Sequence, residues 1–120
     1  MSNTEFKEIK NIILKALDDL KTLDVVSIDV SKKSNFKDLL LIGTGTSSTH
    51  IKAISNEVIE KIKKNGFEKT IRGVEVDNEW VLIDLYDIVI NLMINETREF
   101  YGLEKLWSID NSYKSEITSS

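Results

Sequence analysis

Two glycines stand where a predicted strand meets a predicted helix, an arrangement that can bind phosphate. The residues are Gly43-Thr44-Gly45, followed by Ser47 and Ser48. Helix N-termini bind anions, and glycines let backbone N–H groups approach a ligand closely. The segment lacks the third glycine of a dinucleotide fingerprint and the Gly-Lys-Ser/Thr ending of a P-loop. The pattern therefore favours a tight turn with a serine N-cap over a nucleotide site.

His50 is the only histidine of the chain and the first candidate for a general base. With Ser47 or Ser48 and an aspartate it has the residue types of a Ser-His-Asp triad. Neighbouring positions at one helix start do not form such a relay by spacing alone, and no strained nucleophile turn is visible. We interpret His50 as a residue of the capping turn or of an interface.

Asp84 and Asp87 form a carboxylate pair at the end of a predicted strand. Paired carboxylates can hold Mg²⁺ or divide the roles of acid and base. These two are three residues apart across a tight turn, where aspartate commonly accepts hydrogen bonds from nearby backbone N–H groups. The spacing favours turn chemistry over catalysis and leaves both as candidate contacts for a basic partner.

Aromatic and arginine side chains of the type that anchors protein interfaces gather late in the chain: Trp80, Tyr86, Arg98, Tyr101 and Trp107. The same residue types also fill cores and sheet edges, and for Trp80 both interpretations stay open. Trp80, Leu82 and Asp84 alternate along one strand and so share one face. A tryptophan beside an acid on a sheet face fits docking to a basic protein.

The composition excludes several classes of function. The 120 residues are 41% hydrophobic and 30% charged, which indicates one globular domain. The absence of cysteine excludes disulfides and thiolate metal sites, and a single histidine excludes a multi-histidine site within one chain. The net charge of -4 argues against a basic nucleic-acid-binding surface over the whole chain. We expect no cofactor and no metal.

No apolar stretch approaches the roughly 20 residues that span a bilayer. Residues 1–10 contain two lysines, two glutamates and no apolar core of a signal peptide. We expect a cytoplasmic protein.

Hydrophobic periodicity predicts two long helices. The first has apolar residues three or four apart, begins with a possible Ser2–Glu5 capping box and stops near residues 22–24. Its stripe is Phe6, Ile9, Ile13, Leu17 and Leu20. The second ends at Asn65-Gly66, and its stripe is Ile51, Ile54, Val58 and Ile62.

Strands are predicted at residues 25–30, 39–42, 71–76, 79–85 and 88–94. In the first, Val26, Ile28 and Val30 are expected to face the core. The second strand, the second helix and the third strand are long enough to form a parallel βαβ unit, and the last three strands form an antiparallel meander. We therefore predict an α/β single domain, a mixed five-stranded sheet with packed helices. The domain is expected to cover residues 1–107, and the polar residues 108–120 to form a disordered tail.

Three blocks of sequence resemble the Iojap-related ribosomal silencing factor family. They are residues 43–50 (GTGTSSTH), 80–87 (WVLIDLYD) and 98–107 (REFYGLEKLW), and the resemblance extends over residues 6–107. The chain departs from the family pattern at Thr49, where the family usually has arginine, at Tyr86, where it has glycine, and at Asn91, where it has histidine.

The resemblance implies a non-enzymatic translational repressor with a nucleotidyltransferase-like core. Such factors bind ribosomal protein fourteen of the large subunit and so block joining of the small subunit when nutrients are scarce. The resemblance also implies a possible homodimer off the ribosome, no membrane partner and no direct sequence-specific nucleic acid. The contact residues carried over to this sequence are Trp80, Leu82, Asp84, Tyr86, Asp87, Asn91, Arg98 and Tyr101.

Two alternatives remain. Organellar relatives suggest a role in assembly of the large subunit, which shares the docking site with repression. A nucleotidyltransferase-like enzyme would use the segment at Gly43, but no Asp-x-Asp pair lies on the strand that follows it.

Overall fold

The computed structural model describes residues 2–32 and 37–97. Its elements, in chain order, are α1 (Asn3–Asp19), β1 (Leu23–Asp29), β2 (Leu39–Gly45), α2 (Ser48–Lys64), the 3₁₀ turn η1 (Glu68–Thr70), β3 (Ile71–Val76), β4 (Trp80–Leu85) and β5 (Ile88–Ile94). The predicted tail at 108–120 and the sequence block at 98–107 lie outside the described residues.

One mixed sheet contains all five strands in the order β1-β2-β5-β4-β3. β2 and β5 are parallel, and the other three pairs are antiparallel. This confirms the predicted five-stranded α/β fold and the β3-β4-β5 meander. The neighbour of β2 was predicted wrongly, because β5 and not β3 lies beside it. The meander folds back toward β2, which leaves β3 at the far edge of the sheet.

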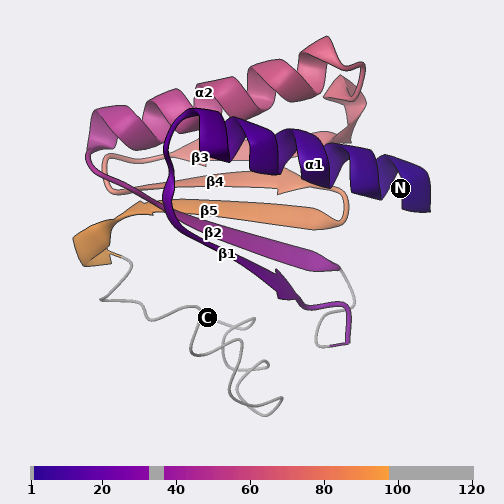
Figure 1. Cartoon of the computed structure of the whole chain (residues 1–120), viewed down its shortest axis with the longest axis horizontal. Coiled ribbons are helices and arrows are strands. Elements are labelled where there is room, and N and C mark those ends of the chain that lie inside the picture. The colour runs from indigo at the N-terminus through magenta and orange to yellow at the C-terminus, as the bar shows by residue number, and fades with distance from the viewer. Residues whose placement is uncertain (1, 33–36, 98–120) are drawn as a thin grey trace.

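Both helices cover the same face of the sheet (Figure 1). The predicted helical stripes supply this core, since Ile9, Ile13 and Leu17 of α1 are at most 1% exposed. From α2, the four residues of the predicted stripe are fully buried. The sheet contributes alternate residues of its central strands, which are Leu39, Leu41, Val81, Ile83, Leu85, Ile88, Ile90 and Leu92.

The opposite face of the sheet, here called the second face, carries the other alternate residues: Val26, Ile28, Leu40, Ile42, Thr44, Trp80, Leu82, Asp84, Val89, Asn91 and Met93. A smaller apolar cluster lies on this side. Its buried members are Val30, Leu40 and Ile42, with Ile28 and Val89 packed against them. Ile28 and Val30 face this apolar cluster, as predicted, on the side of the sheet opposite the helices, and Val26 is half-buried on the same side. Ser27 and Asp29 instead lie on the side of α1, where they line a hollow with Asn3, Phe6 and Lys10.

Side-chain caps fix the starts of both helices. The Ser2 hydroxyl accepts a hydrogen bond from the Glu5 backbone N–H at 3.2 Å, and the Ser47 hydroxyl accepts one from the His50 N–H at 3.1 Å. These bonds satisfy N–H groups that have no partner within the helix. α2 ends at Lys64 with Asn65 as its C-cap, and Gly66 follows with φ +86°, a left-handed conformation that glycine adopts without strain.

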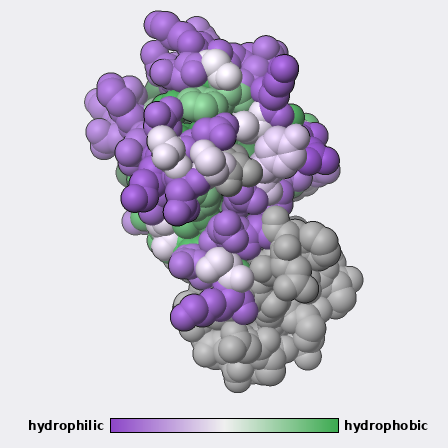
Figure 2. Space-filling view, turned by 90° about the vertical axis from the view of Figure 1, so that its right-hand side faces the viewer, coloured by the Kyte–Doolittle hydropathy of each residue, from purple (hydrophilic) through white to green (hydrophobic). Residues whose placement is uncertain are grey.

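Viewed from the side near the N-terminus of α1, the surface is mostly hydrophilic, with hydrophobic side chains showing in small areas (Figure 2). None of the helices in the described ranges is both long and apolar enough to cross a membrane.

Candidate functional site

Four of the predicted contact residues meet on the second face of the sheet. Trp80, Leu82 and Asp84 alternate along β4, while the residues between them are buried under the helices. Asn91 on β5 is the register partner of Leu82, and Trp80 is the partner of Met93. All four contact residues are half-buried. The predicted alternation along β4 is confirmed, and it gathers an indole, a leucine, a carboxylate and an amide on one surface.

Asp84 already has a charged partner within the chain. The Lys37 ammonium forms an ion pair with the Asp84 carboxylate and also donates to the backbone oxygens of Leu85 and Tyr86, at 2.6 Å and 2.9 Å. Asp84 was singled out from the sequence, but its partner Lys37 was missed. It lies in a stretch that reads as an ordinary polar loop, and no local pattern connects it to β4. The Asp84 charge is therefore largely compensated before any partner arrives.

Tyr86 and Asp87 occupy the turn between β4 and β5 and point to different surroundings. Tyr86 is 44% exposed, and its ring centroid lies 4.7 Å from the Arg72 guanidinium carbon in a cation–π contact. Asp87 lines the hollow of about 490 Å³ beside the start of α1. The structure thus separates Asp87 from the contact residues of the second face. The remaining two predicted contact residues, Arg98 and Tyr101, lie outside the described residues.

The same hollow contains Asp29, whose carboxylate is held by its own turn. The Ser31 hydroxyl and the Ser31 backbone N–H donate to Asp29 Oδ1 at 2.6 Å and 2.9 Å. These bonds favour the ionised form, chiefly through the hydroxyl, and lower the pKa of Asp29 below its usual value. Within residues 2–32 and 37–97, no group of three or more histidine, aspartate or glutamate side chains is arranged to hold a metal ion.

The glycine segment is not a loop. Gly43-Thr44-Gly45 forms the last part of β2 and pairs in register with Leu92, Met93 and Ile94 of β5. A Cβ at Gly43 would lie 2.6 Å from Thr22 Cγ2, and one at Gly45 would lie 2.4 Å from Ile51 Cγ2. These glycines allow β2 to pack against the end of α1 and the start of α2. The predicted serine N-cap is confirmed at Ser47, but the predicted tight turn at the glycines is wrong.

His50 joins the two helices. Its Nδ1 accepts a hydrogen bond from the Thr46 backbone N–H at 2.9 Å, which leaves the proton of the neutral ring on Nε2. Nε2 then donates to the Leu20 carbonyl oxygen at 2.7 Å. Because both ring nitrogens are engaged with backbone groups, the histidine serves the capping turn, as interpreted from the sequence, and is not aimed at a serine hydroxyl.

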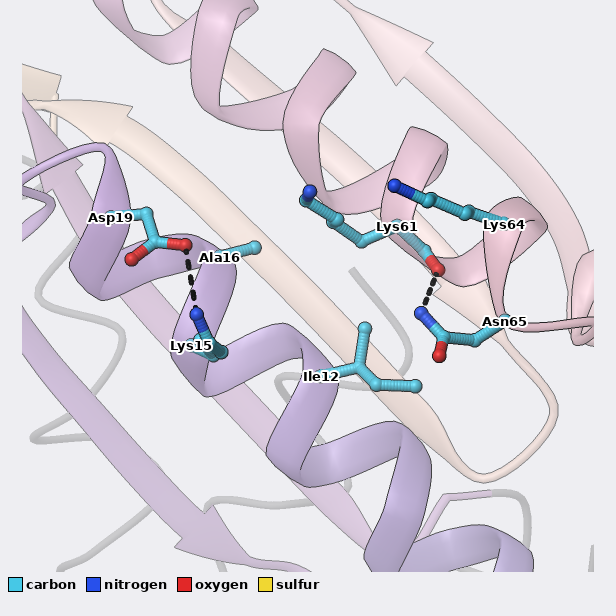
Figure 3. Close-up of a pocket in the computed structure, with 7 residues that line it drawn as sticks. All are labelled: Ile12, Lys15, Ala16, Asp19, Lys61, Lys64 and Asn65. Atoms are coloured by element: carbon cyan, nitrogen blue, oxygen red, sulfur yellow. Dashed lines mark hydrogen bonds and ion pairs between the residues drawn. The ribbon is translucent and has the colours of Figure 1, made fainter.

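A shallow groove of about 390 Å³ separates the outer surfaces of α1 and α2 (Figure 3). Ile12 and Ala16 of α1 line it on one side, and Lys61 and Lys64 from the last turn of α2 line it on the other. Cations in that turn favourably oppose the negative end of the helix dipole. Lys15 on the other wall is paired with Asp19 at 3.6 Å. The position of the lysines is thus explained by the helix itself, and none of the predicted site residues lies here.

Comparison with known proteins assigns the family. Residues 3–120 match the family model described as "Ribosomal silencing factor during starvation". Ribosomal silencing factors of Haemophilus influenzae and Chromobacterium violaceum are 38% and 33% identical to this chain, over 80% and 86% of it and over 94% and 84% of their own lengths. The mouse protein "Mitochondrial assembly of ribosomal large subunit protein 1" is 35% identical over 72% of this chain, which spans 39% of the mouse protein.

Solved structures agree with the fold. A crystal structure of a Chromobacterium violaceum protein superposes with a TM-score of 0.79 at 35% identity, covering 84% of both chains. One from Bacillus halodurans gives 0.74 at 34% identity, covering 84% of this chain and 94% of the other.

The fold is a two-layer α/β domain, a five-stranded mixed sheet with two long helices on one face. The matches over nearly the whole chain make the assignment specific. The chain belongs to the ribosomal silencing factor family.

Proposed function

We propose that this protein represses translation by binding the large ribosomal subunit through its ribosomal protein fourteen and blocking the small subunit from joining, above all when nutrients are limiting. The observation that carries the proposal is the half-buried Trp80 on the second face, with Leu82 and Asn91 beside it. Family membership supports the ribosome as the target, and the cytoplasm as the place of action. The protein needs no catalysis and no cofactor for this role, because occupying the subunit interface is sufficient.

The apolar part of the second face is the expected source of affinity. Tryptophan is the residue type most often found as an interface hot spot, and truncating a hot spot to alanine costs at least about 2 kcal/mol. Asp84 is a weaker anchor than its charge suggests, because Lys37 already pairs with it. The acidic chain still assists approach to a basic ribosomal protein, since complementary charge mainly raises the association rate.

The test is co-sedimentation of the purified protein with purified large subunits. Trp80→Ala is expected to weaken binding about 30-fold, which corresponds to about 2 kcal/mol. Val74→Ala is the matched control, because Val74 is 38% exposed on β3 but lies opposite Ile83, on the other face. Thermal melts establish that both variants are folded. Equal binding of folded Trp80→Ala and wild type would move the ribosome contact away from this face.

Repression itself requires a second measurement. Adding the protein to large subunits before small subunits should reduce the yield of joined ribosomes, and Trp80→Ala should restore it. Undiminished joining at saturating protein would contradict the steric mechanism.

A role in large-subunit assembly is the second candidate, favoured by the mouse relative whose name states that role. The two roles share one docking surface and differ in the particle that is bound. A sucrose gradient of cells containing the tagged protein separates them, since a repressor travels with mature large subunits and an assembly factor with precursors. A homodimer off the ribosome is also part of the proposal, and sedimentation equilibrium tests it.

A nucleotidyltransferase-like enzyme is not favoured. Such an enzyme would bind phosphate at residues 43–45, but these residues form the end of β2, where the two glycines make room for Thr22 and Ile51. The likeness of the fold to a nucleotidyltransferase core stays a prediction.

A further inference from the structure

Asn91 is a polar side chain among apolar residues of the second face, of which Ile42 and Met93 are at most 3% exposed. Its register partners are Ile42 on β2 and Leu82 on β4. Along β5, Val89 and Met93 precede and follow it on the same face. Four apolar side chains therefore surround the amide, which is itself half-buried.

The amide has no hydrogen-bond partner within the part of the chain that the structure describes. The indole N–H of Trp80, diagonally across from Asn91 on β4, also has none there. Both side chains are half-buried, so part of each is accessible to solvent in the free protein. A partner that covers this face removes that solvent, and each polar group left without a hydrogen bond then costs binding free energy.

The surroundings restrict what can pair with the amide. A charged side chain placed against Asn91 would lose its water among four apolar neighbours and gain only a neutral partner, which is unfavourable. A peptide group is neutral and carries one acceptor and one donor. It matches the donor and the acceptor of an asparagine side chain.

We propose that the Asn91 side-chain amide forms hydrogen bonds with one backbone peptide group of the partner protein. Trp80 donates its indole N–H to a further acceptor on the same segment of the partner. This inference rests on the proposed function, since it concerns the same face. It identifies the contact on the partner as a segment of exposed backbone flanked by apolar side chains. Asn91 is then a specificity-determining residue, because surfaces without a free peptide group would leave the amide unpaired.

The test is Asn91→Leu, which keeps the approximate shape of the side chain and removes both hydrogen-bonding groups. The free protein should keep its melting temperature or gain a few degrees, because an apolar side chain fits the four apolar neighbours. Binding to isolated, purified ribosomal protein fourteen should weaken about tenfold or more, as expected for losing one or two hydrogen bonds at a desolvated site. A merely structural asparagine would not give higher stability together with weaker binding.

Asn11→Leu is the matched control, since Asn11 is exposed on α1, away from the second face. It should bind as wild type does. Unchanged or tighter binding of Asn91→Leu overturns the inference, and so does weaker binding that accompanies a lower melting temperature. Weaker binding to whole large subunits but not to the isolated ribosomal protein also overturns it, because the amide would then face RNA. If wild type and Trp80→Ala both bind the isolated ribosomal protein equally weakly, the result contradicts the proposed function, and with it the inference that rests on it.

Discussion

Lys37 secures the corner at which β4 turns into β5. One ammonium group meets the Asp84 carboxylate and two backbone oxygens, those of Leu85 and Tyr86. The lysine and aspartate side chains are only 24% and 36% exposed, so solvent screens this pair less than a surface pair. The contact also connects the beginning of β2 to β4 across β5, which lies between them in the sheet.

Replacing Lys37 by methionine should destabilise the protein by about 1–2 kcal/mol, because it leaves a partly buried carboxylate and two carbonyl oxygens without their donor. The double variant with Asp84→Asn should recover part of that loss, since the unpaired charge is gone. Urea unfolding at neutral pH measures both values.

Lys15→Met is the control for this prediction. Its partner Asp19 and Lys15 itself are 43% and 79% exposed, and such pairs contribute at most about 0.5–1 kcal/mol. Equal destabilisation by Lys37→Met and Lys15→Met would show that the corner contributes no more than a surface ion pair. The same geometry makes Asp84→Lys a poor probe of docking, because it places two ammonium groups side by side within the free protein.

At the scale of the elements, the junction of β2 with α2 depends on close approach. Gly45 lies where β2 ends, and Ile51 in the first turns of α2 is fully buried against it. His50 holds the same junction to the last residues of α1 through the Leu20 carbonyl. The segment that resembles a phosphate loop in sequence is therefore a packing joint between a strand and two helices.

Gly45→Ala should destabilise the protein by about 1–3 kcal/mol, because the added Cβ would lie 2.4 Å from Ile51 Cγ2 in a site without free space. Gly73→Ala is the matched control on the edge strand β3, where no atom lies within 4 Å of the new Cβ. Its effect should be small and can be stabilising, since alanine restricts the unfolded chain. Thermal unfolding compares the two, and a Gly45→Ala variant as stable as Gly73→Ala would contradict the packing role.

The elements show which parts of the fold local sequence determines. Both helical stripes and the alternation along β4 were predicted correctly, because periods of 3.6 and 2 follow from backbone geometry. Alternation does not say which face the helices cover, and Ile28 and Val30, predicted to face the core, belong to the smaller apolar cluster on the opposite face. The neighbour of β2 was also missed, because strand order depends on contacts between distant segments.

The candidate site was predictable to a similar degree. The sequence grouped Trp80, Leu82 and Asp84, since they belong to one strand, and the family resemblance added Asn91. It did not find Lys37, whose link to Asp84 arises only from tertiary packing. It grouped Asp87 with Asp84, although the turn at residues 86 and 87 directs Asp87 toward α1.

At the scale of the whole molecule, one layer of helices covers one face of the sheet, and four of the residues predicted to contact the ribosome, Trp80, Leu82, Asp84 and Asn91, lie on the other. Both long helices pack on the other face, over the main core. Trp80, Leu82 and Asn91 are only half-buried on the second face, so substitutions at these positions are expected to change binding with less loss of stability than substitutions in the main core. This separation makes Trp80 and Asn91 suitable probes.

The proposed domain boundary after residue 107 is the last prediction. Residues 98–107 include five large apolar side chains, namely Phe100, Tyr101, Leu103, Leu106 and Trp107, whereas residues 108–120 include only Ile109, Tyr113 and Ile117. Burial of so few apolar groups cannot offset the conformational entropy lost on ordering thirteen residues. Fixing the backbone costs about 1–2 kcal/mol per residue. Removing residues 108–120 should therefore leave the melting temperature and binding to large subunits nearly unchanged.

The shorter chain that ends at Thr97 is the matched comparison, because it also removes the apolar block and the predicted contacts Arg98 and Tyr101. It should melt several degrees lower and bind large subunits more weakly. Thermal melts and co-sedimentation of the full chain and both truncations decide the matter. If removing residues 108–120 alone lowers the melting temperature by several degrees, the domain extends beyond residue 107. If both truncations behave alike, the domain ends near β5, and Arg98 and Tyr101 are not part of the proposed docking surface.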